Sequence, residues 1–150
     1  MKATISFRGA GNCDIAFMLN LRKLSMGQHL SNAGLNLTDD QHMVRIKEHF
    51  KDSNIILCNK KDIGLLKLGL LTESIHIRQF QLLPEFQGKG IGGQVLELVK
   101  RRAFKLDLPV TLNVLLKNPA KQLYERHGFR VQEKNALEYA MCCPLSEIQH

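Results

Sequence analysis

Past the middle of the chain lies the glycine-rich segment Gln87-Gly88-Lys89-Gly90-Ile91-Gly92-Gly93. An apolar run that ends at Leu82-Leu83 precedes it, and residues 91–106 follow it with the apolar spacing of a helix. A strand, a glycine-rich turn and a helix in this order form an anion site. The first amides of a helix have no internal partners, and the helix dipole adds positive potential there. We therefore predict that the turn binds a phosphate-bearing cofactor through backbone N–H groups.

The glycines of this segment agree with two patterns. Gly88, Gly90 and Gly93 satisfy G-x-G-x-x-G, the fingerprint of dinucleotide-binding proteins. That fingerprint belongs in the first strand–helix unit of a chain, with a second nucleotide-binding half behind it. Too little chain follows the segment here for such a half. Gln87, Gly90 and Gly92 fit a second pattern, Q/R-x-x-G-x-G/A, so the glycines by themselves permit two cofactors.

Length and composition indicate one globular domain. The chain has 150 residues, of which 44% are hydrophobic and 23% are charged, as is ordinary for a single domain. No apolar run approaches the roughly 18 residues that span a membrane, and the N-terminus lacks the apolar core of a signal peptide. The four cysteines form no C-x-x-C pair. We expect a single domain over residues 1–150, located in the cytoplasm and without membrane association.

The formal charge of +7 raises the question of a nucleic-acid partner. Nucleic-acid-binding modules usually combine clustered basic residues with aromatic side chains. Here Trp is absent, Tyr and Phe are few, and the basic residues are scattered. The nearest approach to a patch is Lys100, Arg101, Arg102 and Lys105. We interpret it as a solvated helix face, or as a surface that attracts a polyanionic cofactor, and we do not expect nucleic acid as a partner.

The rest of the sequence predicts a regular order of strands and helices. Periodicity and turn residues predict strands at residues 3–8, 54–59, 63–71, 75–83, 110–116, 129–133 and 137–142. The same signals predict helices at residues 12–25, 38–50, 91–106 and 119–127. Asn12 is expected to cap the first helix, and Thr38 with Gln41 forms a capping box for the second. Glycines and asparagines at residues 26–37 predict a loop or a short helical turn.

Two blocks of sequence carry a family resemblance. The first is Ile77-Arg78-Gln79-Phe80-Gln81-Leu82-Leu83-Pro84-Glu85-Phe86-Gln87-Gly88-Lys89-Gly90-Ile91-Gly92, and the second is Leu112-Asn113-Val114-Leu115 with Asn118, Leu123-Tyr124 and Gly128-Phe129. Together they resemble the GNAT (Gcn5-related) N-acetyltransferases, and residues 21–30 resemble small bacterial members of that family. The resemblance implies an α/β (α+β) fold with a single GNAT-type domain. Its mixed, mostly antiparallel sheet of about seven strands would be splayed between strands 4 and 5 and flanked by about four helices.

The resemblance also implies a cosubstrate, acetyl-CoA, and the residues that bind it. Pantetheine would extend the backbone pairing of Phe80, Gln81 and Leu82, and the pyrophosphate would be held by the amides of Gln87, Gly88, Lys89, Gly90, Ile91, Gly92 and Gly93. Asn118 resembles the family asparagine that contacts pantetheine, although its position before a proline explains it equally well as a helix cap. The histidines show no metal-ligand spacing, so no metal is expected.

The resemblance suggests two catalytic residues. Tyr124 matches the family tyrosine that protonates the leaving sulfur, and the alternative is a tyrosine of the core. Counted back from Gln87, His76 falls where a glutamate base stands in the histone-acetylating branch, and its ordinary pKa suits neutral pH. A purely structural histidine, Glu73 as the base, or proton loss to water remain alternatives. Asn113 stands where ribosomal-protein acetyltransferases carry a glutamate, and an amide is not a base.

These observations predict an N-acetyltransferase that moves an acetyl group from acetyl-CoA to a primary amine. The acceptor would be a small-molecule or peptide amine, and a homodimer remains open. The alternative is a weak or inactive GNAT module that binds CoA as a sensor or as a partner-binding unit.

Overall fold

Seven strands in the described part of the chain form one sheet in the order β1-β2-β3-β4-β5-β7-β6. The computed structural model describes residues 3–148. The strands are β1 (Ile5–Gly9), β2 (Ser53–Cys58), β3 (Lys61–Leu70), β4 (Ile75–Leu82), β5 (Val110–Leu115), β6 (Arg130–Lys134) and β7 (Glu138–Cys143). Neighbouring strands are antiparallel except β4 and β5, which are parallel. The predicted mixed, mostly antiparallel sheet is confirmed, as is its last hairpin.

Within the described residues, four α-helices flank this sheet: α1 (Ile15–Asn32), α2 (Asp39–Lys47), α3 (Ile91–Leu106) and α4 (Ala120–Arg126). Short 3₁₀ turns lie at Asn12–Asp14, Phe50–Asp52, Pro84–Phe86 and Leu145–Glu147. None of the helices in residues 3–148 has the length and apolar character that a membrane span requires.

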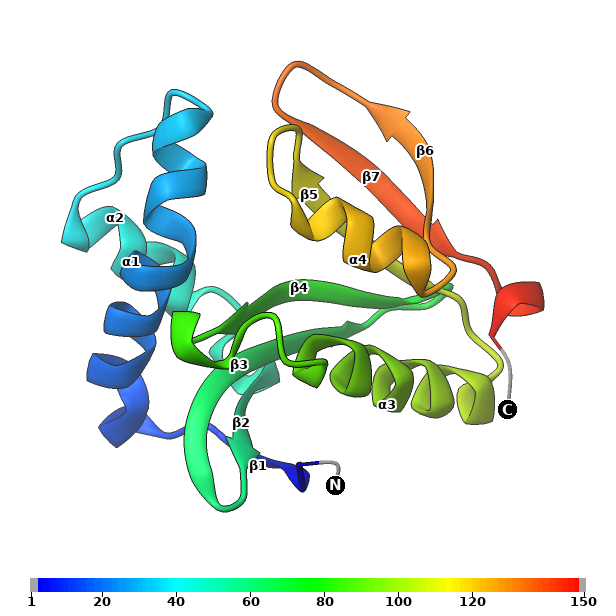
Figure 1. The fold of residues 1–150 in the computed structure, drawn as a ribbon, viewed down its shortest axis with the longest axis horizontal. Coiled ribbons are helices and arrows are strands. Elements are labelled where there is room, and N and C mark those ends of the chain that lie inside the picture. The colour runs from blue at the N-terminus through cyan, green and yellow to red at the C-terminus, as the bar shows by residue number, and fades with distance from the viewer. Residues whose placement is uncertain (1–2, 149–150) are drawn as a thin grey trace.

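The sheet opens between β4 and β5. Their pairing is limited to Ile75, His76 and Ile77 opposite Val110, Thr111 and Leu112. Beyond these residues β4 continues to Leu82 without a β5 partner, while β5 continues to pair with β7. Figure 1 shows the result, an opening with α1 and α2 on one side and α4, β5, β6 and β7 on the other. The predicted splay is confirmed, and it leaves backbone groups of β4 available to an extended ligand.

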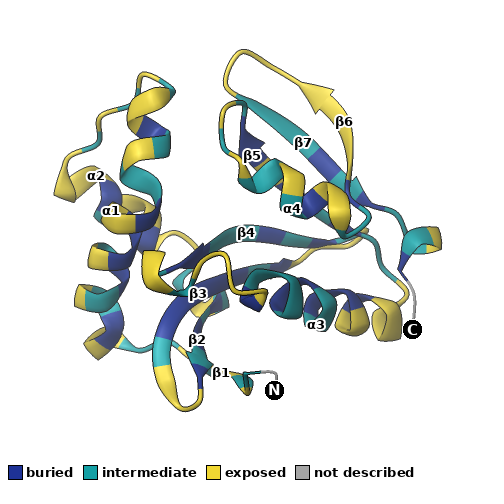
Figure 2. Cartoon of the chain, viewed as in Figure 1, coloured by how far each residue is buried: buried dark blue, intermediate teal, exposed yellow. Residues whose placement is uncertain are grey.

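Alternate residues of the central strands build two separate apolar clusters, because successive side chains of a strand point to opposite faces. Ile56 and Leu66 belong to a large cluster that includes the inner face of α3. Ile55 and Leu65 belong to a smaller cluster under α1 and α2. Figure 2 shows β3 buried along most of its length, whereas β6 is exposed throughout.

The first helix differs from its prediction at both ends. It continues to Asn32 instead of ending near residue 25, so the loop expected at residues 26–37 begins later. A glycine inside a helix costs about 1 kcal/mol relative to alanine, but Gly27 lies between the buried residues Ser25 and Leu30, whose packing outweighs that preference. Asn12 does not cap this helix. It begins a 3₁₀ turn, and Asp14 accepts a hydrogen bond of 2.8 Å from the Gly11 amide instead.

Other boundaries move by a few residues. The capping box of α2 is confirmed, with hydrogen bonds of 3.2 Å to Thr38 Oγ1 and 2.8 Å to Gln41 Oε1. This helix ends at Lys47, before the predicted residue 50, because His49 adopts a left-handed conformation and a 3₁₀ turn follows. The turn between β2 and β3 consists of Asn59 and Lys60, both at positive φ.

Candidate functional site

A pocket of about 550 Å³ lies where β4 and β5 separate. Four parts of the chain line it: α1, β4, the glycine loop and α4. The lining residues are Ser25, Met26, His29, Phe80, Gln81, Leu82, Gln87, Gly88, Gly90, Gly92, Gly93, Asn118, Pro119, Ala120, Leu123, Tyr124 and Arg126. Most of the predicted cofactor residues and Tyr124 are therefore brought together. Lys89, Ile91 and His76 do not line this pocket.

The glycine loop forms the N-terminal end of α3. Gly90 is the N-cap residue at φ 81°, and Gly88 has φ 71°. An L side chain in this left-handed conformation costs roughly 1–2 kcal/mol. A Cβ at either position would meet nothing within 4 Å, so the space beside the backbone is open. Open space in front of the first amides of a 16-residue helix suits an anion such as a pyrophosphate.

The loop is anchored to the strand that precedes it. Gln87 Nε2 donates a hydrogen bond of 2.9 Å to the Leu82 carbonyl oxygen. Lys61 and Lys89 both place their ammonium groups near the Phe86 ring, at 5.4 and 5.7 Å from its centroid. These contacts hold two cations beside the loop, where they add to the positive potential of the helix end.

Gln81 contributes an unusual polar atom to the pocket. The Gln81 residue is only 5% exposed, and its side-chain oxygen, Oε1, is buried without a hydrogen-bond partner among residues 3–148. A buried acceptor without a partner is destabilising, typically by about 1–3 kcal/mol. Phe80 packs against the α3 cluster, and Gln81 is paired with Leu65 of the α1–α2 cluster. Gln81 therefore faces the α1 side of the sheet.

Tyr124 lies in α4, two residues before its end at Arg126, and is 8% exposed. Its ring packs edge-on against Phe129, with 5.8 Å between the centroids. Burial raises the pKa of Tyr124 to about 12, so its hydroxyl carries a proton throughout the neutral range. That hydroxyl has no hydrogen-bond partner within residues 3–148, and the residue lines the pocket. Tyr124 can therefore donate a proton or a hydrogen bond to a bound group.

Asn118 lies at the start of α4. Its Oδ1 accepts a hydrogen bond of 2.9 Å from the Ala120 amide. The predicted capping interaction is thus present. It uses only the side-chain oxygen, so the Nδ2 group remains a donor on the pocket wall.

His76 lies outside the 550 Å³ pocket that Tyr124 lines. His76 lies in the paired part of β4, and its Nδ1 is 2.7 Å from Thr111 Oγ1. It lines a smaller pocket of about 170 Å³, together with Arg78 and Lys67. Burial and the charge of Arg78 lower the pKa of His76, which favours the neutral ring that a base requires. Glu73, the other candidate base, is exposed and lines neither pocket.

Three pocket residues of α1 were not predicted from the sequence: Ser25, Met26 and His29. Their segment was expected to leave the helix near residue 25. Ser25 and His29 are four residues apart, which places them on one face of a helix. A longer helix prediction would have drawn attention to this pair. Arg126, near the end of α4, was also missed. Within residues 3–148, no group of three or more His, Cys, Asp or Glu side chains is arranged to hold a metal ion.

Residues 51–131, more than half of the chain, match the family described as "Acetyltransferase (GNAT) domain". No curated protein matches significantly by sequence.

Solved structures with the same fold include three acetyltransferases. PaiA N-acetyltransferase from Thermoplasma acidophilum, in complex with coenzyme A, has a TM-score of 0.74 at 16% identity, covering 94% of this chain and 99% of that one. An acetyltransferase from Thermus thermophilus has a TM-score of 0.75 at 20% identity, covering 94% and 97%. A chimera of spermidine N-acetyltransferase SpeG from Vibrio cholerae and hSSAT has a TM-score of 0.72 at 23% identity, covering 96% and 97%. With its splayed sheet, its glycine loop and the match over residues 51–131, this chain belongs to the GNAT acetyltransferase family.

Proposed function

We propose that this protein is an N-acetyltransferase that uses acetyl-CoA and acts on a primary amine. The observation that carries the proposal is the 550 Å³ pocket, which joins the glycine loop, the unpaired edge of β4 and Tyr124 in one continuous space. The thioester of acetyl-CoA supplies the activated acetyl group. The open loop and the unpaired β4 edge match the phosphates and the amide-containing arm of this cosubstrate.

The pocket residues would have separate roles in cosubstrate binding and in proton transfer. Backbone amides from Gly88 to Gly93 would hold the pyrophosphate, and Asn118 Nδ2 would contact the pantetheine arm. Tyr124 would donate its proton to the leaving thiolate, a role that suits a phenol whose pKa is raised to about 12. The Gln81 oxygen, on the α1 side, would accept a hydrogen bond from the incoming amine.

The amine must lose a proton before it attacks, and two histidines are candidates for this step. His76 would act through water, because it lies outside the pocket of Tyr124. His29 lines that pocket directly, from α1. Replacing each by glutamine distinguishes them. Replacing the residue that acts as the base should lower turnover most at and above neutral pH, where an imidazole base is unprotonated in the wild type, and least at acidic pH, with little change in acetyl-CoA affinity.

The charge of the pocket favours some acceptors over others. A polyamine keeps a second ammonium group after one nitrogen is bound, and that group needs anionic partners. No Asp or Glu is among the pocket-lining residues of the described chain, and Arg126 adds a positive charge. We therefore propose an acceptor whose non-reacting part is apolar or anionic. Turnover should be lower with spermidine than with an aryl-alkyl amine or an amino acid.

Calorimetry and a turnover screen test the proposed function together. Folded protein titrated with acetyl-CoA or CoA should show saturable binding, and one class of amine should release free thiol from acetyl-CoA. Binding without turnover on any amine class would favour the inactive CoA-binding module instead. No binding at millimolar CoA would refute both.

A further inference from the structure

A pocket of about 380 Å³, which we call the flank pocket, lies beside α3. Within residues 3–148 it shares no lining residue with the 550 Å³ pocket. Its floor is formed by side chains of β3 and β4, namely Leu66, Leu68, Leu70 and Ile75. Leu66 and Ile75 belong to the α3 cluster and Leu68 packs against it, so the floor lies on the α3 side of the sheet. Leu98 lines the pocket from α3.

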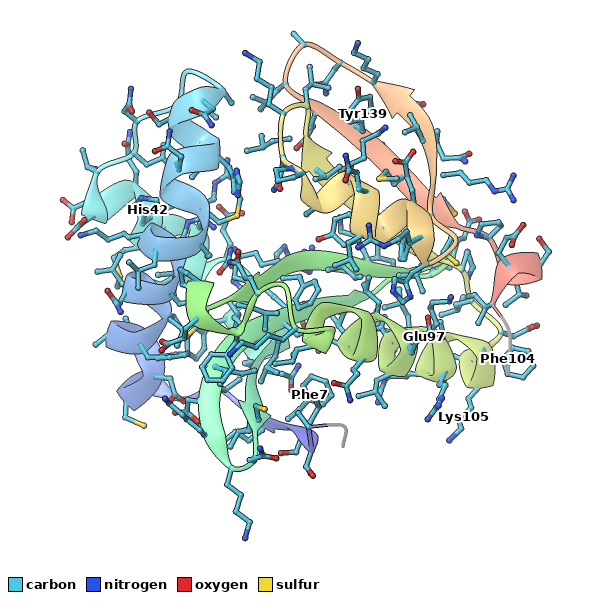
Figure 3. All side chains as sticks on the ribbon, viewed as in Figure 1. Phe7, His42, Glu97, Phe104, Lys105 and Tyr139 are labelled. Atoms are coloured by element: carbon cyan, nitrogen blue, oxygen red, sulfur yellow. The ribbon has the colours of Figure 1, made fainter. Side chains whose placement is uncertain are left out.

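The flank pocket leaves apolar surface open to solvent. Leu70 is 65% exposed, and Phe7, which lines the pocket from β1, is 37% exposed. Figure 3 labels Phe7 between β1 and α3. Apolar side chains that are exposed around one hollow indicate a ligand groove, whereas the same residues scattered singly would not. An occupant of this pocket should therefore have an apolar body.

Two cations line the same pocket. Lys51 belongs to the 3₁₀ turn before β2, and Arg102 belongs to α3. Both residues are exposed, and neither side chain forms a hydrogen bond or an ion pair within residues 3–148. Long basic side chains that lie along apolar surface keep their charged ends in water. Both charges are therefore available to an anionic group of a ligand.

The acidic residue of the flank pocket, Asp52, is already paired. Its Oδ2 accepts a hydrogen bond of 3.1 Å from Arg78 Nε. Gly69 leaves room for this contact, because a Cβ at that position would lie 2.5 Å from the Arg78 guanidinium. The other polar residue, Asn54, is uncharged, and its Nδ2 donates a 3.2 Å hydrogen bond to the Asp52 carbonyl oxygen. The charge that the pocket offers to a ligand is therefore positive.

We propose that the flank pocket binds a small amphiphilic carboxylate, with its apolar body on the leucines of β3 and its carboxylate paired with Lys51 and Arg102. The planar guanidinium of Arg102 matches the two oxygens of a carboxylate. A cationic ligand would find only Asp52, which Arg78 already holds. A small hydrophilic anion would leave the exposed leucines uncovered. The volume of about 380 Å³ lies in the range of small-molecule sites. This site does not depend on the proposed acetyl transfer.

The test compares octanoate with two probes that each lack one of its parts. Octylammonium has the apolar chain with the opposite charge, and acetate has the carboxylate without the chain. Calorimetry on the wild-type protein should show saturable binding of octanoate, about tenfold or more tighter than that of either other probe. In NMR titrations, the backbone amides that shift should lie around the flank pocket.

Four outcomes would each overturn the inference. They are no binding of octanoate at millimolar concentration, equal affinity for octanoate and octylammonium, equal affinity for octanoate and acetate, and NMR shifts centred on the 550 Å³ pocket. Binding to phosphatidylglycerol vesicles without binding of free octanoate falls under the first outcome and would assign the cations to a lipid surface.

Paired substitutions at exposed positions locate the site. Arg102→Gln should weaken octanoate binding about fivefold or more, and its matched control is Arg101→Gln, the next residue of α3, which lies outside this pocket. Leu70→Ala should weaken binding several-fold through lost apolar contact, and its matched control is Leu71→Ala, an exposed leucine outside the pocket. Both controls should bind octanoate like the wild type. Unchanged affinity in the Arg102 and Leu70 variants would place the ligand elsewhere. Melting temperatures of all four variants verify that the fold is retained.

Discussion

The two sides of the sheet are held together by different interactions. On the α3 side, 20 buried residues within the range 3–148 form one apolar cluster, and the glycine loop at the start of α3 offers backbone groups to a ligand. On the α1–α2 side, the cluster has five buried residues within the range 3–148. Buried polar contacts also stabilise this side. The proposed cofactor site therefore relies on backbone conformation, whereas the α1–α2 side of the sheet relies on particular buried side chains.

Hydrogen bonds of three side chains, Arg22, Lys67 and Asp14, position helices α1 and α2. Buried Arg22 donates a 3.0 Å hydrogen bond from Nε to His42 Nδ1, joining the two helices. Burial lowers the pKa of His42, which keeps its ring a neutral acceptor. Lys67, 1% exposed, donates to the carbonyl oxygens of residues 45, 46 and 48 at the end of α2. Asp14 fixes the start of α1 through Arg8.

The largest effect is expected from Tyr124→Phe on the cofactor side. The variant keeps the packing against Phe129 but removes the proton donor, so turnover should fall about 100-fold or more. Acetyl-CoA affinity should stay within about twofold, because no binding contact in the proposal uses the hydroxyl. Steady-state kinetics and calorimetry measure the two quantities.

The control for this prediction is Tyr139→Phe, since Tyr139 lies on β7 outside the 550 Å³ pocket (Figure 3). Its turnover should match the wild type. Unchanged turnover in the Tyr124 variant would remove the proposed role of this tyrosine.

Gly90→Asp tests the backbone site directly. A carboxylate at this left-handed N-cap would face the bound pyrophosphate, and CoA affinity should fall about 100-fold. The thermal stabilisation that CoA gives the wild type should then disappear. Gly90→Ala separates conformational strain from charge: it should lower stability by roughly 1 kcal/mol and retain much of the binding. Equal CoA stabilisation of the wild type and the Asp variant would place the cofactor elsewhere.

Lys67→Met tests the α1–α2 side of the sheet. The variant leaves three carbonyl oxygens at the end of α2 without their donor, so unfolding free energy should decrease by about 2 kcal/mol. CoA binding should persist, because the lysine lies on the other side of the sheet. Lys105→Met, at an exposed position near the end of α3, is the control and should be near neutral. A Lys67 variant that keeps its stability but loses CoA binding would contradict the proposed separation of the two sides of the sheet.

The smallest effect is expected at Asp14. Hydrogen bonds from Arg8 and from the Gly11 amide lower the pKa of Asp14. Because the folded-state pKa is depressed, the stabilisation is present above the ordinary aspartate pKa near 4 and is lost as the pH falls through the folded-state value. Asp14→Asn should therefore lower the free energy of unfolding by about 1 kcal/mol at pH 7. The difference should become progressively smaller as the solution is acidified below pH 4.

Denaturant unfolding at several pH values measures this difference. Asp62→Asn, which removes the more exposed partner of Arg8, should have a smaller effect. A constant gap between the wild type and the Asp14 variant at every pH would show that the carboxylate charge is not responsible.

Much of the cofactor side was predictable from local sequence. The glycine spacing, the order of strand, turn and helix, and the start of α3 at Ile91 all appear in the structure as expected. The pocket residues on α1 were not predictable in the same way. A glycine and several asparagines suggested a loop at residues 26–37. The helix instead continues to Asn32, and the burial of Leu30 outweighs local propensity.

The sequence alone determined the family, the strand order along the chain and the loop at residues 87–93, because each depends on neighbouring residues whose preferences act locally. Only the tertiary structure decided that β4 and β5 part after three residue pairs, that Gln81 is buried without a partner, and that His29 shares a pocket with Tyr124 while His76 does not. These features arise between segments far apart in sequence. Burial and polar contacts across such distances are set by packing, which no local pattern encodes.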